Sequence, residues 1–134
     1  MKNLILLSIA ISFAGIIKAQ DTNLPRVFVV LDITVHDTLM YEQYRINVEK
    51  VIRDFGGKYL VRSGGMNFDT DPERKVISVE GNWNPNRLII IQWNSIEQLQ
   101  KFTLSEAYKK IAELRANSAT TKSIIVKEYL NANN

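Results

Sequence analysis

Four charged residues, Asp32, Arg62, Glu80 and Arg87, fall in or beside segments that are otherwise apolar and rich in β-branched residues. Strand alternation and nearby glycines can direct several of these side chains into one cleft. A carboxylate held there beside guanidinium groups could act as a base or bind a polar ligand. The same residues could instead form an ion-pair network around the glycine bends and at a subunit boundary. The sequence leaves both interpretations open.

Two further side chains could take part in chemistry. His36 is the only histidine and follows the first strand-like segment, where it is either a proton acceptor or a solvated or capping residue. Trp83 lies in a loop, where its ring could stack on a planar ligand or cover the open end of a small core. We take Asp32 and His36 as the candidate catalytic residues.

Metal and phosphate sites are not predicted. The spacing of three acidic residues, Asp69, Asp71 and Glu80, resembles that of a calcium-binding loop. However, Arg74 occupies the position at which such a loop needs glycine, and Pro72 stiffens the turn. The two glycine pairs, 56–57 and 64–65, do not have the spacing of a phosphate-binding loop. We therefore predict neither a metal nor a cofactor.

Composition restricts the class of protein. The 134 residues suffice for one domain, and 46% hydrophobic with 23% charged residues is typical of a globular chain. The absence of cysteine excludes disulfides and thiolate chemistry. Basic residues are scattered among carboxylates instead of clustering, so nucleic acid is not an expected partner.

The N-terminal segment predicts export. A short polar start precedes an almost wholly apolar run from Leu4 to Ile17, and Ala19 offers a small residue before a cleavage point at Gln20. The run is shorter than the roughly 20 residues that span a bilayer as a helix. We expect residues 1–19 to be a signal peptide, 20–25 a leader, and the processed protein to be periplasmic or secreted without stable membrane association. Removal of Lys2 and Lys18 from the 17 basic residues leaves 15 against 14 acidic ones, a net charge of +1.

The remaining chain, residues 26–130, alternates strand and helix patterns, followed by a tail over 131–134. Strands are predicted at 26–35, 58–63, 87–93 and 123–130, with a hairpin arm in which 76–80 returns as a short strand. One helix begins at an Asp37 cap and ends at Gly56-Gly57, and a second begins at a Ser95–Gln98 capping box and either restarts or kinks at Ser105. Gly64-Gly65 allows a bend or a bulge in the sheet.

This order predicts an α+β fold, a ferredoxin-like βαββαβ sandwich with an extra hairpin arm. Both helical segments would cover one face of the sheet, and the other face would carry apolar side chains such as Phe28, Val30 and Leu60. Because an apolar sheet face is unstable in water, we expect a homodimer in which two sheets pack face to face as a dimeric α/β barrel.

Four stretches give this chain a family resemblance: GGKYLVRSGG (56–65), EGNWNPNR (80–87), WNS (93–95) and SEAYKKI (105–111). Together they resemble the domain-of-unknown-function 1330 (DUF1330) family of the dimeric α/β-barrel superfamily, from about Arg26 to Tyr129. The arm before Glu80 and the export signal depart from that family's pattern. The resemblance points to these positions, whose roles in the family are undefined: Tyr44, Gly57, Tyr59, Arg62, Gly64, Gly65, Glu80, Gly81, Trp83, Arg87, Tyr108 and Arg115.

Two functions remain open at this point. The first is an exported protein that binds a small apolar or aromatic molecule in a cleft between subunits. Its expected ligand-binding residues are Tyr44, Arg62, Glu80, Trp83 and Arg87. The second, implied by the superfamily resemblance, is a cofactor-independent monooxygenase or isomerase with Asp32 or His36 as proton acceptor. Superfamily relatives that act on haem or quinols use a histidine or asparagine with a tryptophan, and His36 with Trp83 or Trp93 resembles that pair. Because fold does not determine function, we rank the enzyme second.

Overall fold

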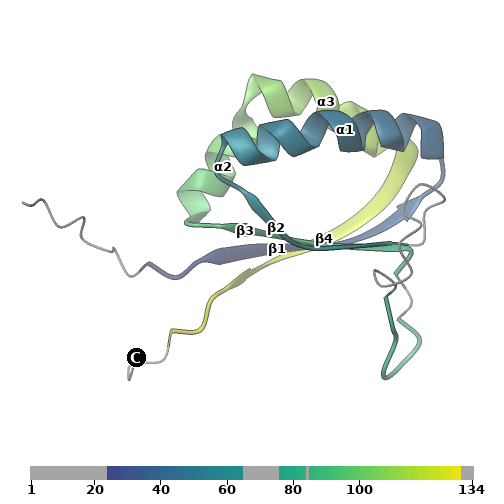
Figure 1. The fold of residues 1–134 in the computed structure, drawn as a ribbon, viewed down its shortest axis with the longest axis horizontal. Coiled ribbons are helices and arrows are strands. Elements are labelled where there is room, and N and C mark those ends of the chain that lie inside the picture. Colours follow the sequence, from purple (N-terminus) through teal and green to yellow (C-terminus); the bar gives the residue numbers. More distant parts are fainter. Residues whose placement is uncertain (1–23, 65–75, 84, 131–134) are drawn as a thin grey trace, which may run out of the picture.

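The computed structural model describes residues 24–64, 76–83 and 85–130. Figure 1 shows the elements in chain order. They are β1 (Val27–Val35), α1 (Thr38–Asp54), β2 (Lys58–Gly64), β3 (Arg87–Trp93), α2 (Ile96–Leu104), α3 (Glu106–Ser118) and β4 (Ala119–Lys127). The expected signal peptide, leader and tail, and the Asp69–Asp71 part of the calcium-like loop, lie outside the described residues.

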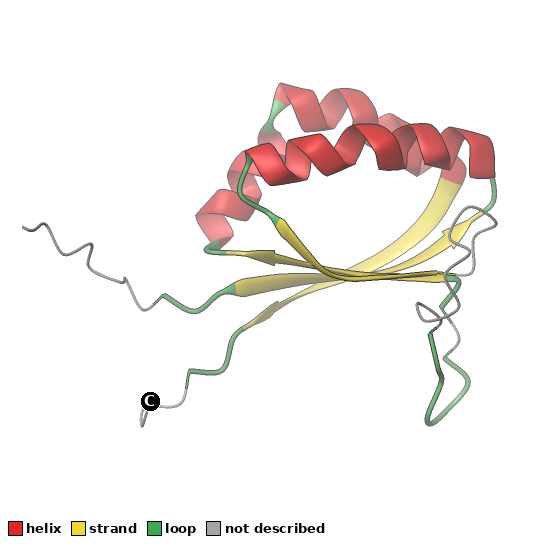
Figure 2. Ribbon diagram, viewed as in Figure 1, coloured by secondary structure: helices red, strands yellow, loops and turns green. Residues whose placement is uncertain are grey.

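The four strands form one antiparallel sheet in the order β2-β3-β1-β4. The apolar strands β1 and β3 occupy its centre, where each has a neighbouring strand on both sides. All three helices lie on the same side of the sheet (Figure 2). The predicted ferredoxin-like α+β fold is confirmed.

The core lies between the helices and one face of the sheet. Alternate residues of β1 and β3 point into it, as the period-two geometry of a strand requires. They meet the inner stripes of α1 and α2, and Trp93 packs on Phe102 with ring centroids 4.9 Å apart. The buried hydrophobic residues are Val27, Ile33, Tyr41, Tyr44, Val48, Ile52, Ile89, Ile91, Trp93, Leu99, Phe102 and Ala119.

Capping residues set the helix ends. The Asp37 carboxylate accepts a hydrogen bond from the Met40 amide, and Ser95 and Ser105 begin α2 and α3 in the same way. Ser105 therefore ends one helix and begins the next, as the predicted kink suggested. The predicted capping box is shifted by one residue, because Gln98 Oε1 accepts from the amide of Asn94 and not from that of Ser95.

Two sequence-based expectations differ from the structure. The last strand begins at Ala119, not Ser123, because the Ser118 carbonyl is already held by the amides of His36 and Asp37, which ends α3 there. The irregularity of β2 lies at Leu60, between Tyr59 and Val61, whereas Gly64 pairs with Arg87. Residues 76–80 form no strand with the described chain, and residues 65–75, which complete the expected hairpin arm, lie outside the described residues.

The opposite face of the sheet carries no helix (Figures 1 and 2). We call it the helix-free face, and its apolar side chains are half-buried or exposed. Cross-strand register places Val30 beside Ile90 and Ile124, and Ile90 beside Val61. Phe28, Leu88 and Val126 complete this apolar surface.

Within the described chain, no helix combines the length and hydrophobicity needed to cross a membrane.

Candidate ligand-binding site

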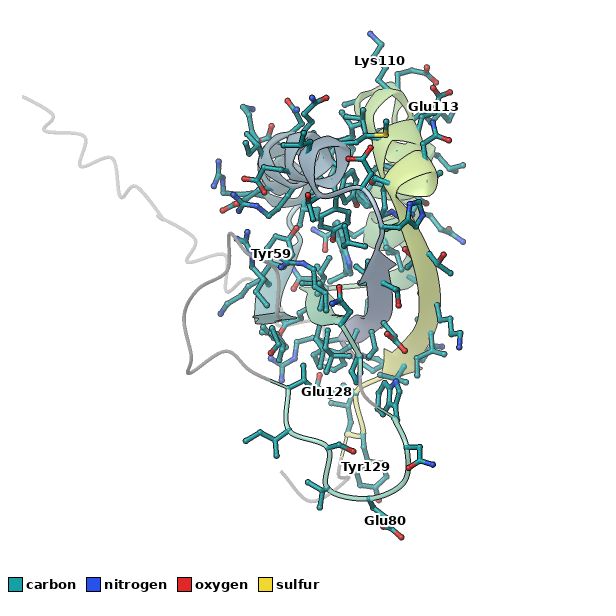
Figure 3. The ribbon with its side chains drawn as sticks, turned by 90° about the vertical axis from the view of Figure 1, so that its right-hand side faces the viewer. Tyr59, Glu80, Lys110, Glu113, Glu128 and Tyr129 are labelled. Carbon is teal, nitrogen blue, oxygen red and sulfur yellow. The ribbon has the colours of Figure 1, made fainter. Side chains whose placement is uncertain are left out.

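The bulge at Leu60 decides which face receives the charged residues of β2. In a regular strand, residues 59 and 62 would point to opposite faces. The extra residue in the bulge places both side chains on the same face. Tyr59 pairs with Ile91 and Arg62 pairs with Ile89, and these two isoleucines are core residues. Arg62 therefore points toward the helices, and Figure 3 shows Tyr59 on the same side of the sheet.

Arg87 reaches that face from the first position of β3. It pairs with Ile33 and Gly64, and its side chain is only 2% exposed. The guanidinium carbon lies 5.8 Å from the centre of the Tyr41 ring. A charged group this deep is costly, because the loss of its hydration must be offset by its surroundings.

Aromatic hydroxyls and guanidiniums from four elements gather around this position. We call the set the tyrosine–arginine cluster. Its members are Tyr41 and Tyr44 of α1, Tyr59 and Arg62 of β2, Arg87 of β3, and Tyr108 and Arg115 of α3.

Contacts within the cluster repeat one pattern, a guanidinium over a phenol ring. Arg62 lies 5.0 Å from the Tyr59 ring centre, and Arg115 lies 5.8 Å from that of Tyr44. Arg115 also donates to the Tyr108 hydroxyl at 3.0 Å. Such cation–π contacts stabilise a partly desolvated guanidinium by about 1–2 kcal/mol. Each arginine of the cluster thus lies beside a phenol ring.

Carboxylates stand at the rim of the cluster. Glu49 accepts from Arg62 at 3.2 Å, and Glu42 forms a two-point contact with Arg45 at 2.6 Å. The hydrogen bond from Arg45 lowers the pKa of Glu42. Glu42 is therefore ionised at neutral pH and holds Arg45 in place, while Glu49 holds Arg62 through its hydrogen bond.

Burial controls the protonation of the phenols. It raises the pKa of Tyr59 to about 12 and that of Tyr41 above its usual value, although nearby arginines offset part of the effect. The pKa of Tyr44 is raised further, again mainly by burial. All three tyrosines therefore carry their protons at neutral pH, so they can donate hydrogen bonds to a ligand but cannot act as bases.

A small cavity of about 30 Å³ lies among these side chains, between α1 and the sheet. A void this size holds about one or two water molecules, whereas sites for drug-sized ligands measure about 300–1,000 Å³. Its polar lining comes from the cluster and Arg45. Its apolar lining is Leu31, Ile33, Val48, Ile52, Ile89 and Ile91.

Asp32 and Trp83 lie on the other side of the sheet. Asp32 pairs with Leu88 and Lys122, and its Oδ2 accepts a 2.8 Å hydrogen bond from Trp83 Nε1. They border an open hollow of about 290 Å³ on the helix-free face, together with Val30, Lys122, Ser123 and Ile124. The contact between Asp32 and Trp83 joins the loop before β3 to the centre of the sheet.

The expected site residues therefore do not share one cleft. Tyr44, Arg62 and Arg87 meet on the helix-covered face, whereas Asp32 and Trp83 meet on the helix-free face. His36 is exposed at the end of β1, and Glu80 is exposed beyond the sheet (Figure 3). Neither contacts the tyrosine–arginine cluster through any interaction found in the described chain. The separation follows from strand alternation, since Asp32 and Ile33 point to opposite faces.

Sequence reasoning missed Tyr41 as a member of the site. It included Tyr44 but not Tyr41 among the ligand-binding residues, yet both tyrosines are buried, with ring centroids 5.6 Å apart. The signal was present: two tyrosines one helical turn apart, facing strands that carry Arg62 and Arg87. Among the described residues, no three of the types His, Asp and Glu lie close enough to hold a metal ion.

Comparison with known proteins gives the family and the fold. Residues 26–129 match the family described as "Domain of unknown function (DUF1330)". The fold is similar to RPA0582, a protein of unknown function from Rhodopseudomonas palustris, at 11% identity and a TM-score of 0.61, over 80% of this chain and 85% of that one. No match was found among curated proteins.

Two other solved structures share the fold. One is SnoaB, a cofactor-independent oxygenase from Streptomyces nogalater, with 12% identity, a TM-score of 0.54, and coverage of 82% of this chain and 99% of that one. The other is a conserved protein from Methanosarcina mazei Go1, with 14% identity, a TM-score of 0.51, and coverage of 79% and 95%. At these identities the similarity establishes the fold alone.

Proposed function

This chain belongs to the DUF1330 family, and we propose that it binds a small planar anion in the tyrosine–arginine cluster between α1 and the sheet. The ligand class is an aromatic carboxylate or phenolate. The observation that carries the proposal is Arg87, a guanidinium that is 2% exposed and lines the cavity. Apolar side chains of similar volume often stabilise a core as well as a buried ion pair does, so stability alone does not favour arginine here.

The lining of the cavity matches that ligand class. Guanidiniums bind carboxylates through two parallel hydrogen bonds, and the protonated phenols of Tyr41 and Tyr59 add donors. The aliphatic wall of Ile89, Ile91 and their neighbours suits a flat hydrocarbon ring. A neutral ligand would gain the apolar contacts but not the charge interaction.

Ligand entry requires the cavity to widen at its rim. Arg45 and Arg62 stand there, tied to the partly exposed Glu42 and Glu49. Partly exposed ion pairs of this kind contribute only about 0–1 kcal/mol, so they can open at small cost. Burial of the ligand would then strengthen its interaction with Arg87, because charges interact more strongly where water is excluded.

The proposed functional unit is a homodimer. The helix-free face carries aliphatic side chains from all four strands, with Ile90 and Val30 at its centre. Contiguous apolar patches of this kind normally mark an interface, and a two-fold pair of identical sheets would cover both copies at once. Because the cluster lies on the opposite face, each copy would keep its own ligand site.

We also propose that the protein acts after export. The support is the sequence pattern of residues 1–19, an apolar run followed by a small residue before Gln20. An exported binding protein would meet its ligand in the periplasm or outside the cell. Mass spectrometry of the protein expressed with its own N-terminus would test this, since processing predicts a mature chain that begins at Gln20.

A cofactor-independent monooxygenase or isomerase is the second candidate. Arginines and phenols that stabilise a bound carboxylate would also stabilise the enolate or phenolate of a substrate. The weakness of this candidate is the proton acceptor, because no residue that lines the cavity in the described chain is a carboxylate or histidine. Asp32 and His36 lie outside it, so the substrate would have to enter already ionised.

Thermal unfolding with benzoate and benzamide tests the binding proposal. The two probes have similar shape, but only benzoate carries a negative charge at neutral pH. At about ten times its Kd, benzoate should stabilise the protein by about 1.4 kcal/mol, a Tm increase of roughly 5–10 °C. Benzamide should give a much smaller increase. Equal stabilisation by both compounds, or by neither, would contradict the proposal.

Two variants locate the effect. Arg87→Met removes the charge while keeping much of the side-chain volume, and should abolish the difference between benzoate and benzamide. Arg53→Met is the matched control, since Arg53 is an exposed residue in the last turn of α1 and should retain the full benzoate response. Loss of the response in both variants would mean that benzoate binds nonspecifically. Oxygen consumption with quinols would test the enzymatic alternative in the same samples.

A further inference from the structure

The segment Val76–Trp83, which we call the arm, is the most exposed apolar part of the described chain. Ile77 is 81% exposed and Val79 is 96% exposed. The arm leaves the sheet on the helix-free side (Figures 1 and 2), and Figure 3 shows Glu80 far from the helices. Its base is fixed, because Trp83 donates a hydrogen bond to Asp32. A chain that places isoleucine and valine there leaves a large apolar surface in water.

The sequence of the arm is typical of a β-strand, but within the described residues the arm is not paired with another strand. Val76 to Glu80 reads VISVE, in which three β-branched aliphatic residues surround one serine. In the described chain these residues pair with no strand. A segment with strand propensity that pairs with no strand of its own described chain can add to the edge of another sheet through backbone hydrogen bonds.

The two edges of the sheet differ in how they are protected. At one edge, β2 is interrupted by the bulge at Leu60, and a bulge discourages pairing with a further strand. At the other edge, β4 pairs with β1 in unbroken register over nine residues. Its outer part is apolar and open, with Ile124 61% and Ile125 53% exposed. The β4 edge is therefore the better acceptor.

We propose that the arm of one copy adds as a fifth strand to the β4 edge of a second copy. This inference rests on the proposed pairing of two copies through their helix-free faces, which is the side toward which the arm projects. The five residues Val76–Glu80 match the open window that begins at Ser123 and ends at Lys127. In a parallel pairing Glu80 lies opposite Lys127, and in an antiparallel pairing it lies opposite Ser123, the residue after Lys122.

Disulfide formation between two single-cysteine proteins tests the contact directly, since the natural chain has no cysteine. Val79→Cys protein is mixed either with Ile124→Cys protein, whose cysteine lies opposite position 79 in an antiparallel pairing, or with Val126→Cys protein, whose cysteine lies opposite it in a parallel pairing. Each mixture is allowed to exchange subunits and oxidised. We expect one of the two mixtures to give a covalent dimer at least ten times more abundant than any of the proteins alone. A mixture of Val79→Cys with Leu60→Cys, at the β2 edge, is the matched control and should crosslink at the background level.

Sedimentation of the same samples separates failure of the arm from failure of the dimer. Dimers in which position 79 crosslinks to neither 124 nor 126, or crosslinks preferentially to position 60, would overturn the arm contact and leave the dimer intact. Monomers at micromolar concentration would overturn both.

A second pair of variants probes the contact without cysteine chemistry. Val79→Pro removes a backbone donor that a ladder needs, and should weaken dimerisation at least tenfold. Val79→Thr keeps strand propensity at the same exposed position and should leave the dimer constant within about threefold. Equal dimer constants for the two variants would contradict the pairing.

Discussion

On one face of β3, Arg87, Ile89 and Ile91 point into a space closed by α1, whereas on the other face Leu88 and Ile90 point away from every helix. The first environment is completed by the chain itself, so its charges can be oriented before a ligand arrives. The second is completed only when another molecule covers it. Neighbouring residues on one strand can thus serve two tasks, ligand recognition and assembly, without interfering with each other.

Substitution of two adjacent isoleucines should separate these tasks most clearly. Ile91→Asp buries a carboxylate in the core and should cost more than the roughly 2–5 kcal/mol typical of a large-to-small core change, enough to prevent stable folding. Ile90→Asp places the same charge on the helix-free face. It should leave the protomer folded but abolish dimers at micromolar concentration.

Circular dichroism and sedimentation velocity check this pair. A folded Ile91→Asp protein, or an Ile90→Asp protein that remains dimeric, would show that the two faces are not divided as described.

Substitution of two glycines by alanine should show the same contrast between the core and an exposed part of the chain, with smaller losses of stability. A Cβ on Gly57 would lie 2.7 Å from both Ile52 Cγ2 and Trp93 Cη2, so Gly57→Ala should overpack the core and cost about 1–3 kcal/mol. Gly81, on the arm, has open space around its Cα and a φ of 74°. Gly81→Ala should therefore cost only the strain of that backbone conformation, about 1 kcal/mol. Urea denaturation measures both, and a larger loss for Gly81→Ala would contradict the packing described.

The pH dependence of stability should report the burial of the cluster. Burial raises the pKa of Tyr59 from 10.0 to about 12, so the folded state favours the neutral phenol. This contribution is fully present below pH 10 and is lost as the pH rises toward 12. Tyr59→Phe should flatten the stability curve in that window and leave it unchanged at neutral pH, as followed by urea denaturation at several pH values. An unchanged alkaline slope would mean that Tyr59 is hydrated.

The sequence predicted the fold well because the fold depends on local patterns. Strand alternation, the caps at Asp37 and Ser95, and the break at Ser105 all operate over a few residues, and the structure confirms them. Boundaries set by distant contacts were harder to predict. The end of α3 depends on amides of His36 and Asp37, more than 80 residues earlier in the chain.

The arrangement of the candidate site was only partly predictable, because the face on which a strand residue lies depends on irregularities that the sequence does not announce. The bulge at Leu60 brings Arg62 to the helix-covered face, and no glycine marks it. Arg62 and Arg87 therefore lie together on the helix-covered face, apart from Asp32 and Trp83. Asp32, on a regular strand, lies on the helix-free face, as its alternation with Leu31 and Ile33 predicted.

A crystal structure of the purified protein grown with benzoate would test the central claim most directly. We predict electron density for the carboxylate beside Arg87, between α1 and β3, once in each copy of the chain. Density confined to the helix-free face, beside Asp32 and Trp83, would contradict the account, because the ligand would then lie in the surface that we assign to assembly.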